Sequence, residues 1–270
     1  MELSMTTNYG RAASVAAIYD IHGNLPALEA VLTEIEQLAP DYIIVGGDVA
    51  AGPFPSETLD RLMVLNAPNA RVRFLTGNAD REMVARFDVP EGGHTYAPNI
   101  ERTLSWTAQQ VNTAQRDFLA DFAVNVMLDI EGLGPTRFCH GSPRNDEEII
   151  TRMTSDERLA LILADASEPV TVCGHTHIQF DRRSGGKRVV NAGSVGSPYE
   201  GRPGAFWVLL GPDVNLRHTA YDYERAAALI RASSFPDAES FASQDILNPR
   251  EPDEVSALFE QMALAREAGQ

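Results

Sequence analysis

Apolar runs alternate with segments of helical spacing in the first third of the chain. Residues 15–19, 42–45 and 72–75 are short apolar runs of the kind that form buried parallel strands. Between them, residues 25–38 carry apolar side chains three or four positions apart, which predicts an amphipathic helix, and residues 56–65 predict a second helix with a serine at its N-cap. The resulting strand–helix–strand–helix–strand order predicts a sheet with right-handed crossovers.

The remaining chain has more of the short, paired runs that form hairpins. Residues 99–122 have the spacing of two successive helices, and residues 155–166 predict another. Short strands are predicted at residues 124–129, 136–139, 170–173, 179–183, 188–190, 205–210 and 214–220. Beyond Glu224 the chain has helical character, which Pro249 and Pro252 interrupt near the end.

These elements group into one catalytic domain and a tail. We expect the domain to cover residues 12–235 and a helical tail, residues 236–270, to pack on it. A chain of 270 residues with 44% hydrophobic residues can bury one large core. Residues 1–11 are polar and contain no apolar run of a signal peptide, so we expect a short disordered lead-in there. No run of eighteen apolar residues predicts a membrane span.

Cysteine content and net charge limit the expected cellular location and the expected classes of binding partner. Cys139 and Cys173 are too few for a disulfide framework; they predict buried thiols and a cytoplasmic location. The formal net charge is −16 and the isoelectric point is near 4.7, which argues against membrane and duplex nucleic-acid partners. A small phosphorylated substrate would need a local positive field, which bound metal ions could supply. The sequence is compatible with either a monomer or a homo-oligomer.

Polar side chains gather directly after the predicted strands, at the carboxyl ends where open α/β sheets bind ligands. They are Asp20, His22, Asp48, Asn78, His140, His175 and His177. Each alone could be a turn, cap or core residue, but together they predict a metal site. Imidazole, carboxylate and amide ligands suit zinc, iron or manganese, and a carboxylate can bridge two ions. Two ions roughly 3.5–4 Å apart can clamp a phosphate and lower the pKa of a water.

The order of these motifs resembles that of the calcineurin-like metallophosphoesterases. Asp-x-His, Gly-Asp, Gly-Asn, a lone His and Gly-His-x-His follow one another between Asp20 and His177. The HGSP segment at residues 140–143 and the GSVG segment at residues 193–196 are similar to a bacterial and archaeal subgroup of that family. The subgroup includes small phosphodiesterases and enzymes described as diadenosine tetraphosphatases or protein phosphatases.

The resemblance implies a fold, a cofactor and residue roles. The fold would be an α/β (α+β) four-layer αββα sandwich of two mixed β-sheets flanked by helices. The cofactor would be two divalent metal ions, of manganese, iron, zinc or a mixture, with a metal-bridging hydroxide as nucleophile. Asp20, His22 and His177 would hold one ion, Asn78, His140 and His175 the other, and Asp48 would bridge them. The catalytic candidates are Asp48, Asn78 and His140.

One position departs from the family pattern. Many members carry a histidine after the Gly-Asn dipeptide, which is thought to protonate the leaving group or steady the phosphate, whereas this chain has Ala79. An alanine cannot transfer a proton, and a general acid is typically worth about 10²–10⁴-fold in rate. We therefore expect a preference for substrates with good leaving groups. His94 and His218 lie outside the motif, and only His94 is considered as a substitute acid.

Substrate contacts are predicted at Asn24, Arg81, Arg144 and Tyr199. Asn24 could touch phosphate or serve as the N-cap of the helix that it precedes. Arg81 and Arg144 each follow a candidate ligand closely and could bind phosphate or form surface salt bridges. Tyr199 follows the GSVG segment and could stack on a base or ring.

Several functions are compatible with this constellation. The leading hypothesis is a metal-dependent phosphoesterase acting on a nucleotide-type phosphodiester or phosphoanhydride, such as diadenosine tetraphosphate. The alternative in the same class is a phosphomonoesterase, such as a protein serine-threonine phosphatase. A zinc amidohydrolase also uses a His-x-His pair, but on its first strand, whereas here the pair at residues 175–177 comes late. A catalytically silent metal-bound interaction module is the remote alternative, since all seven ligands are present.

Overall fold

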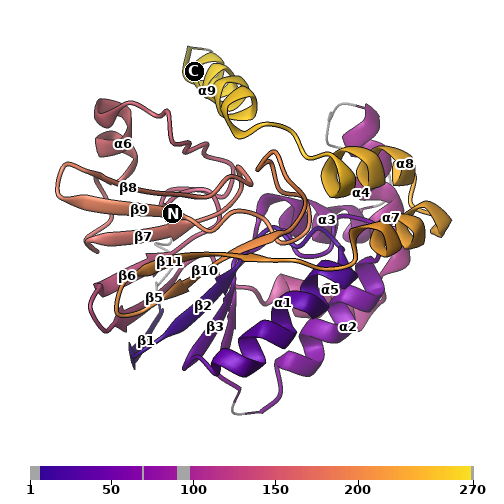
Figure 1. Ribbon diagram of the computed structural model, residues 1–270, viewed down its shortest axis with the longest axis horizontal. Helices are drawn as coiled ribbons and strands as arrows, with labels where there is room; N and C mark the ends of the chain where they lie inside the picture. Colours follow the sequence, from indigo (N-terminus) through magenta and orange to yellow (C-terminus); the bar gives the residue numbers. More distant parts are fainter. Residues whose placement is uncertain (1–6, 69, 90–97, 269–270) are drawn as a thin grey trace.

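Two β-sheets lie face to face with helices on their outer surfaces. The computed structural model describes residues 7–68, 70–89 and 98–268. Figure 1 shows the two sheets side by side, with helices flanking the first and a smaller helical layer over the second. The expected four-layer αββα sandwich is confirmed.

The first sheet contains the parallel strands that the sequence predicts. Its strand order is β11-β10-β2-β3-β4, with β2 to β4 parallel and β10 antiparallel to both neighbours. The bounds are Val15–Ile18 for β2, Tyr42–Val45 for β3, Val72–Phe74 for β4, Ala205–Leu210 for β10 and Val214–Thr219 for β11. Because β2 is covered on both faces, all four of its side chains are apolar and buried.

The second sheet has the order β1-β5-β6-β7-β9-β8. Its strands are β1 (Thr7–Ala12), β5 (Val126–Ile130), β6 (Gly134–Phe138), β7 (Val170–Cys173), β8 (Phe180–Ser184) and β9 (Lys187–Asn191). The predicted hairpin is β8–β9, which turns at Gly185 and Gly186, both in the left-handed region. Parallel pairs β6–β7 and β7–β9 place strand ends at the same edge of this sheet.

The apolar core has a central layer and two outer layers. Between the sheets lie fully buried side chains such as Tyr19, Ile44 and Phe138. Outside the first sheet, helices bury their apolar faces; they are α1 (Leu25–Leu38), α2 (Pro55–Leu65), α3 (Asn78–Asp88), α4 (Pro98–Gln110) and α5 (Thr113–Ala120). Outside the second sheet, α6 (Asp156–Ile162) packs on Cys139 and Cys173, which are free and buried as expected.

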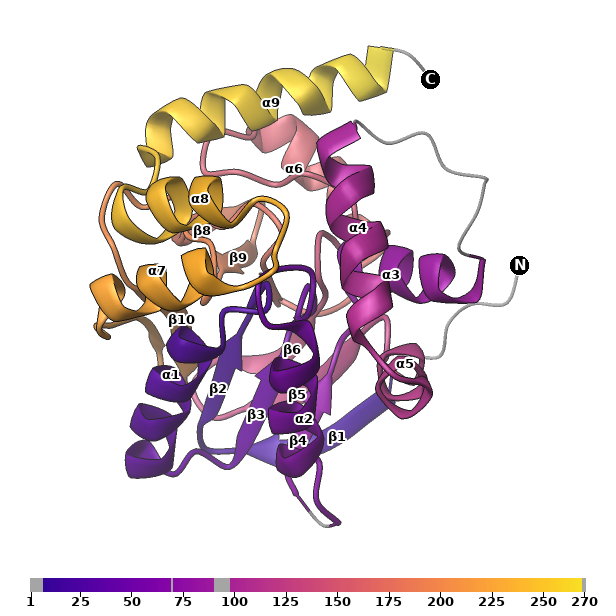
Figure 2. The same cartoon turned by 90° about the vertical axis from the view of Figure 1, so that its right-hand side faces the viewer.

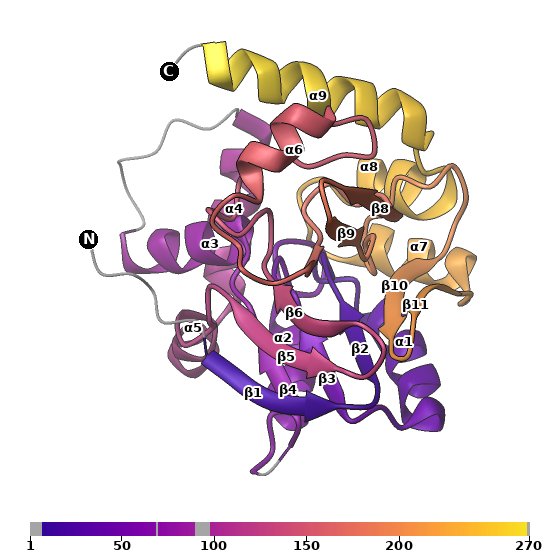
Figure 3. The same cartoon turned by 90° about the vertical axis from the view of Figure 1, so that its left-hand side faces the viewer.

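The tail is a set of short helices followed by a long one. Helix α7 (Tyr223–Ala232) precedes it at the end of the expected domain, and the elements of the tail are α8 (Ala238–Ser240), the π-helical segment η1 (Phe241–Leu247) and α9 (Pro252–Ala268). The prolines interrupt the tail, but Pro252 also begins α9, where its missing N–H is tolerated. In Figure 3, α9 lies across α6. Arg158 of α6 pairs there with Glu260 and Glu267 of α9.

Two expectations are wrong in detail. The predicted lead-in is not disordered over residues 7–12, because these residues form β1 and pair in parallel with β5. A polar segment can do this because an edge strand is held through its backbone, and Tyr9 is covered by the Arg73 guanidinium, 4.2 Å from the ring centroid. The helix that directly follows β4, α3, has no counterpart among the predicted elements, and α6 is shorter than predicted.

Across the parts of the chain that the structure describes, every helix is too short or too polar to cross a lipid bilayer.

Candidate metal centre

The predicted ligands occupy loops with an unusual backbone conformation. Five of them have positive φ: Asp20 (52°), His22 (47°), Asp48 (51°), His175 (65°) and His177 (58°). Within the described residues, Ala39 at the end of α1 is the remaining non-glycine residue in this region. Such a conformation costs on the order of 1–3 kcal/mol per residue and persists where the surroundings enforce it, commonly at functional sites.

Backbone hydrogen bonds hold the first two ligand loops together. The amide of Asp20 donates to the Gly47 carbonyl (3.1 Å), and the amide of His22 donates to the Asp48 carbonyl (2.9 Å). These loops follow the parallel strands β2 and β3, whose carboxyl ends meet at one edge. Adjacent strands therefore fix the relative position of Asp20 and Asp48.

Two glycines of the Gly-Asn and Gly-His motifs make room for the carboxylates. A Cβ on Gly77 would lie 2.1 Å from Asp48 Oδ1, and one on Gly174 would lie 2.5 Å from Asp20 Oδ2. Both distances are far below van der Waals contact. The motif glycines are thus required by the close approach of the carboxylates, which explains why the glycine precedes the ligand in each dipeptide.

The side chains converge into two clusters. One contains Asp20, His22 and His177, the other Asp48, His140 and His175, and in each cluster the ligand atoms lie within 4.8 Å of one another. The free oxygen of each carboxylate lies near histidines of both clusters: Asp48 Oδ2 is 3.9 Å from His22 Nε2 and 3.4 Å from His140 Nε2, and Asp20 Oδ1 is 3.9 Å from His140 Nε2. Asp20 Oδ1 is 3.4 Å from His177 Nε2.

Each carboxylate uses its second oxygen for anchoring. Asp20 Oδ2 accepts from the amide of His175 (2.9 Å), and Asp48 Oδ1 accepts from the amide of Ala79 (2.8 Å). These bonds fix the rotation of both side chains and leave one oxygen of each facing the histidines.

Three of the imidazole rings are oriented by backbone carbonyls. Their Nδ1 atoms face carbonyl oxygens: His22 faces Ala51 (3.1 Å), His140 faces Gly46 (2.9 Å) and His177 faces Ser197 (2.6 Å). A ring nitrogen that faces a carbonyl carries the proton, so the lone pair of a neutral ring lies on Nε2. All three Nε2 atoms point into the clusters, in the orientation that metal-binding histidines adopt.

Buried atoms without partners show that the residues fit a metal ion. Asp20 Oδ1, Asn78 Oδ1 and His140 Nε2 are buried and have no hydrogen-bond partner within the described chain. A buried polar atom without a partner costs about 1–3 kcal/mol. In addition, His22 Nε2 and His177 Nε2 are 3.1 Å apart, although both carry lone pairs when neutral. Divalent cations bound at the two clusters would give Asp20 Oδ1, His140 Nε2 and the facing lone pairs of His22 and His177 a partner.

The protonation states favour cation binding. Burial raises the pKa of Asp48, but the charge of His140 outweighs burial and holds that pKa well below its usual range. Burial and His177 act on the pKa of Asp20 in the same opposed way, and the net pKa is lowered. Burial, together with the charge of His140, lowers the pKa of His175 to about 4. Both carboxylates are therefore ionised and His175 is neutral at pH 7. Burial lowers the pKa of His140, but the charge of Asp48 outweighs burial and raises it to about 10, so a cation bound there would displace the proton of this ring.

Asp80 is a positioning residue that the sequence reasoning missed. Its buried carboxylate accepts hydrogen bonds from the backbone amides of Asp48 (2.7 Å), Val49 (2.9 Å) and Gly77 (3.0 Å). It thereby ties the loop after β3 to the start of α3, where Asn78 lies. The available signal was an acidic residue in the first turn of a helix, three positions after its N-cap glycine.

The tail supports His177 from behind. The ring of Tyr199 stacks on the His177 imidazole (centroids 5.1 Å apart, planes 15° apart), and Phe259 of α9 lies 6.4 Å from Tyr199. Ser197, whose carbonyl orients His177, donates its hydroxyl to Asp245 of η1. Ser197 and Asp245 were also missed, because no local motif marks a contact between residues 48 positions apart.

The other predicted contact residues have protein partners. Asn24 is completely buried; its Oδ1 caps α1 at the Ala27 amide (3.3 Å) and its Nδ2 donates to the Gly196 carbonyl (3.0 Å). His218 is exposed, and its Nε2 is 3.1 Å from the Pro203 carbonyl. His94 lies outside the described residues.

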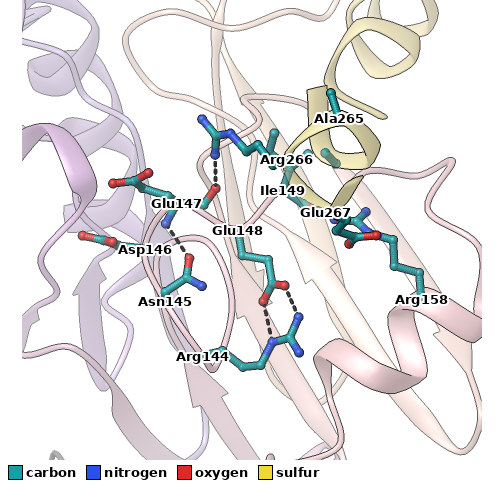
Figure 4. Close-up of a pocket in the computed structure, with 11 residues that line it drawn as sticks. Arg144, Asn145, Asp146, Glu147, Glu148, Ile149, Arg158, Ala265, Arg266 and Glu267 are labelled. Atoms are coloured by element: carbon teal, nitrogen blue, oxygen red, sulfur yellow. Dashed lines mark hydrogen bonds and ion pairs between the residues drawn. The ribbon is translucent and has the colours of Figure 1, made fainter. Parts of the chain in front are cut away.

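Arg81 and Arg144, the two arginines predicted to contact substrate, pair with acidic side chains that line a cavity. This cavity, of about 700 Å³, lies between the loop of residues 144–149 and the end of α9, and its wall contains none of the seven candidate ligands. Figure 4 shows Arg144 directed at Glu148, and the Nε–Oε2 distance is 2.9 Å. Arg81 pairs with Asp146 (2.8 Å) and Glu147 (2.7 Å).

Comparison with known proteins agrees with this geometry. The sequence profile of the calcineurin-like phosphoesterase superfamily domain matches residues 14–210. An uncharacterized protein of Methanocaldococcus jannaschii is 24% identical over 244 residues, which are 83% of this chain and 94% of that protein.

Solved structures with a similar fold cover most of the chain. A hypothetical protein from Pyrococcus horikoshii OT3 has a TM-score of 0.76 and 21% identity over 88% of this chain and 99% of its own. A metallophosphoesterase from Sphaerobacter thermophilus has a TM-score of 0.66 and 27% identity, covering 86% of this chain and 98% of its own. With the profile match spanning every candidate ligand, the chain belongs to the calcineurin-like phosphoesterase superfamily.

Proposed function

We propose that this protein is a two-metal phosphoesterase that hydrolyses a phosphodiester or phosphoanhydride. The observation that carries the proposal is the pair of ligand clusters with unpartnered buried donor atoms. Nucleotide-type substrates, including diadenosine tetraphosphate, fall within this class. A small phosphorylated substrate also suits a chain of net charge −16, since bound cations would offset that charge locally.

Each ligand has a proposed role. Asp20, His22 and His177 would hold one divalent ion, and Asn78, His140 and His175 the other. Asp48 would bridge the two, as the family resemblance implies; its free oxygen lies near a histidine of each cluster, as does that of Asp20. Manganese, iron and zinc all suit this mixed nitrogen and oxygen donor set. When bound, such ions supply charge stabilisation for the phosphate and lower the pKa of a water.

The chain itself positions the reacting groups. The reaction forms a bond from a water oxygen to phosphorus and breaks the ester P–O bond, whose electron pair leaves with the departing oxygen. Ala79 cannot donate the proton that this oxygen then needs, so water must supply it. Substrates whose leaving oxygen is stable as an anion should therefore react faster.

Metal-dependent turnover tests the proposal. The protein is stripped with chelator and assayed on bis-p-nitrophenyl phosphate with manganese added back, beside Asp48→Asn and the matched control Asp117→Asn, an exposed carboxylate on α5. We expect turnover that needs manganese, survives in the control and falls at least about 10²-fold in Asp48→Asn. Activity on the monoester p-nitrophenyl phosphate alone would favour the phosphomonoesterase or protein phosphatase alternative. Full metal occupancy without turnover on any ester would refute the proposal and favour an interaction module.

A further inference from the structure

A small cavity opens beside the ligand clusters, against helix α4. Its volume is about 250 Å³, and its wall includes the candidate ligands His22, Asp48 and Asn78. The remaining wall consists of Ala51, Ala79, Glu82, Ile100, Thr103 and Leu104. Asn78, Ala79 and Glu82 belong to α3, and Ile100, Thr103 and Leu104 belong to α4; Figure 2 shows these two helices packed beside each other. A substituent of a phosphate held at the ligand clusters can reach the cavity directly.

The wall away from the ligands is mainly apolar. Leu104 is 3% exposed and Ala79 is 9% exposed, whereas 45% of Ile100 is exposed. Ala79 contributes only a methyl group at the position where the family resemblance predicts a histidine, so this departure from the pattern leaves room in the cavity. A cavity of about 250 Å³ beside the ligands has room for one ring.

Charge around the cavity argues against a second phosphate there. Its described wall contains no lysine or arginine, and Glu82 is acidic. The arginines on α3 and α4 are paired with acidic groups: Arg81 with Asp146, Arg86 with Glu101 and Arg102 with Asp237. Away from the ligands, a polyphosphate substituent would thus lose hydration without gaining a cationic side chain of the described wall.

We propose that one ester substituent of the substrate is a compact, uncharged apolar or aryl group that binds against Ile100 and Leu104. This inference rests on the proposed function and narrows it: aryl and similar apolar phosphodiesters are the preferred class, and polyphosphates such as diadenosine tetraphosphate are disfavoured. Ile100 is the specificity-determining residue best suited to a test, because a half-exposed side chain can be replaced without opening the core.

Binding and turnover are measured on the manganese-loaded protein. Diphenylphosphinate and dimethylphosphinate carry the same charge, differ only in the rings and cannot be hydrolysed at their P–C bonds; both are titrated by calorimetry. In parallel, kcat/KM is measured for bis-p-nitrophenyl phosphate and diadenosine tetraphosphate. The variants are Ile100→Ala and Ile100→Lys, with Val64→Ala as control, because Val64 is an apolar residue on α2 that is 69% exposed and absent from the wall.

We expect diphenylphosphinate to bind wild-type protein more tightly than dimethylphosphinate. Each Ile100 variant should weaken diphenylphosphinate binding about tenfold, as expected for lost apolar contacts in a pocket, and leave dimethylphosphinate unchanged. Ile100→Lys should also shift kcat/KM in favour of diadenosine tetraphosphate. Equal binding of the two phosphinates, Ile100 variants within twofold of the control, or a wild-type preference for diadenosine tetraphosphate would overturn the inference. Turnover of no ester at all would refute the proposed function, while the phosphinate titrations would still decide whether the cavity binds rings.

Discussion

Replacing Asp80 should loosen the metal centre without removing any ligand. In Asp80→Ala, the amides of Asp48, Val49 and Gly77 lose the acceptors that now lie 2.7–3.0 Å away. Each unsatisfied buried group costs about 1–3 kcal/mol, so three of them cost at least ~3 kcal/mol. For a protein of this size, ~3 kcal/mol lowers Tm by roughly 6–12 °C. Displacement of the Asp48 loop should also weaken manganese binding by about 10–100-fold.

Calorimetric melting of the chelator-stripped protein and competitive titration with a manganese indicator measure these two effects. Asp80→Asn keeps one acceptor oxygen and should fall between wild type and Asp80→Ala, whereas the exposed control Asp117→Ala should change neither quantity. A Tm for Asp80→Ala within 2 °C of wild type, with unchanged manganese affinity, would refute the reasoning, because the three hydrogen bonds would then contribute nothing.

Three further predictions concern the site and its supports. In Gly77→Ala, the new Cβ would lie 2.1 Å from Asp48 Oδ1, so kcat/KM for bis-p-nitrophenyl phosphate should fall about 10²-fold; near-normal turnover would show that the loop adapts. Asp245→Ala, which removes the acceptor of the Ser197 hydroxyl, should weaken manganese binding about tenfold through Ser197 and His177, whereas unchanged affinity would mean that the tail does not orient the ligand. Burial raises the pKa of Glu168, but its hydrogen bond and ion pair with Arg137 (2.8 Å) outweigh burial and lower it. This stabilisation is present above the unfolded-state pKa of Glu168 and is lost as the pH falls through its lower folded-state pKa. Glu168→Gln should therefore make Tm fall less steeply at acidic pH. The same acidic fall of Tm in variant and wild type would show that the Glu168–Arg137 pair does not contribute.

The position of the site could be predicted from the sequence because sheet geometry leaves little choice. Apolar runs such as residues 15–18 and 170–173 are strands in this protein, and the ligands follow their carboxyl ends. Asp20, His22 and His177 form one cluster and Asp48, His140 and His175 the other, whereas the assignment of two ions to them stays a prediction. The left-handed backbone conformation at Asp20 and His175 could not be predicted from the hydrophobic and polar pattern, since neighbouring loops impose that conformation.

The missed features share a physical cause: each depends on backbone groups or on contacts distant in sequence. The strand β1 is polar and pairs through its backbone, so it has no alternation of hydrophobic and polar residues from which it could be predicted. Asp80 binds amides instead of side chains, and its effect on Asp48 crosses 32 positions. Helix α3 begins with a polar turn directly after Gly77, so its apolar residues are too few to show helical spacing in the sequence.

The support of His177 by η1 has a consequence for the biogenesis of the protein. Asp245, which holds Ser197 behind His177, lies far beyond Asp20 and His22 in the chain. Until η1 has docked, the segments around Asp20 and Asp48 are therefore without the support that it gives to His177. If the clusters bind ions as proposed, firm binding would follow docking of the tail, and the site would be completed by the order in which the chain folds.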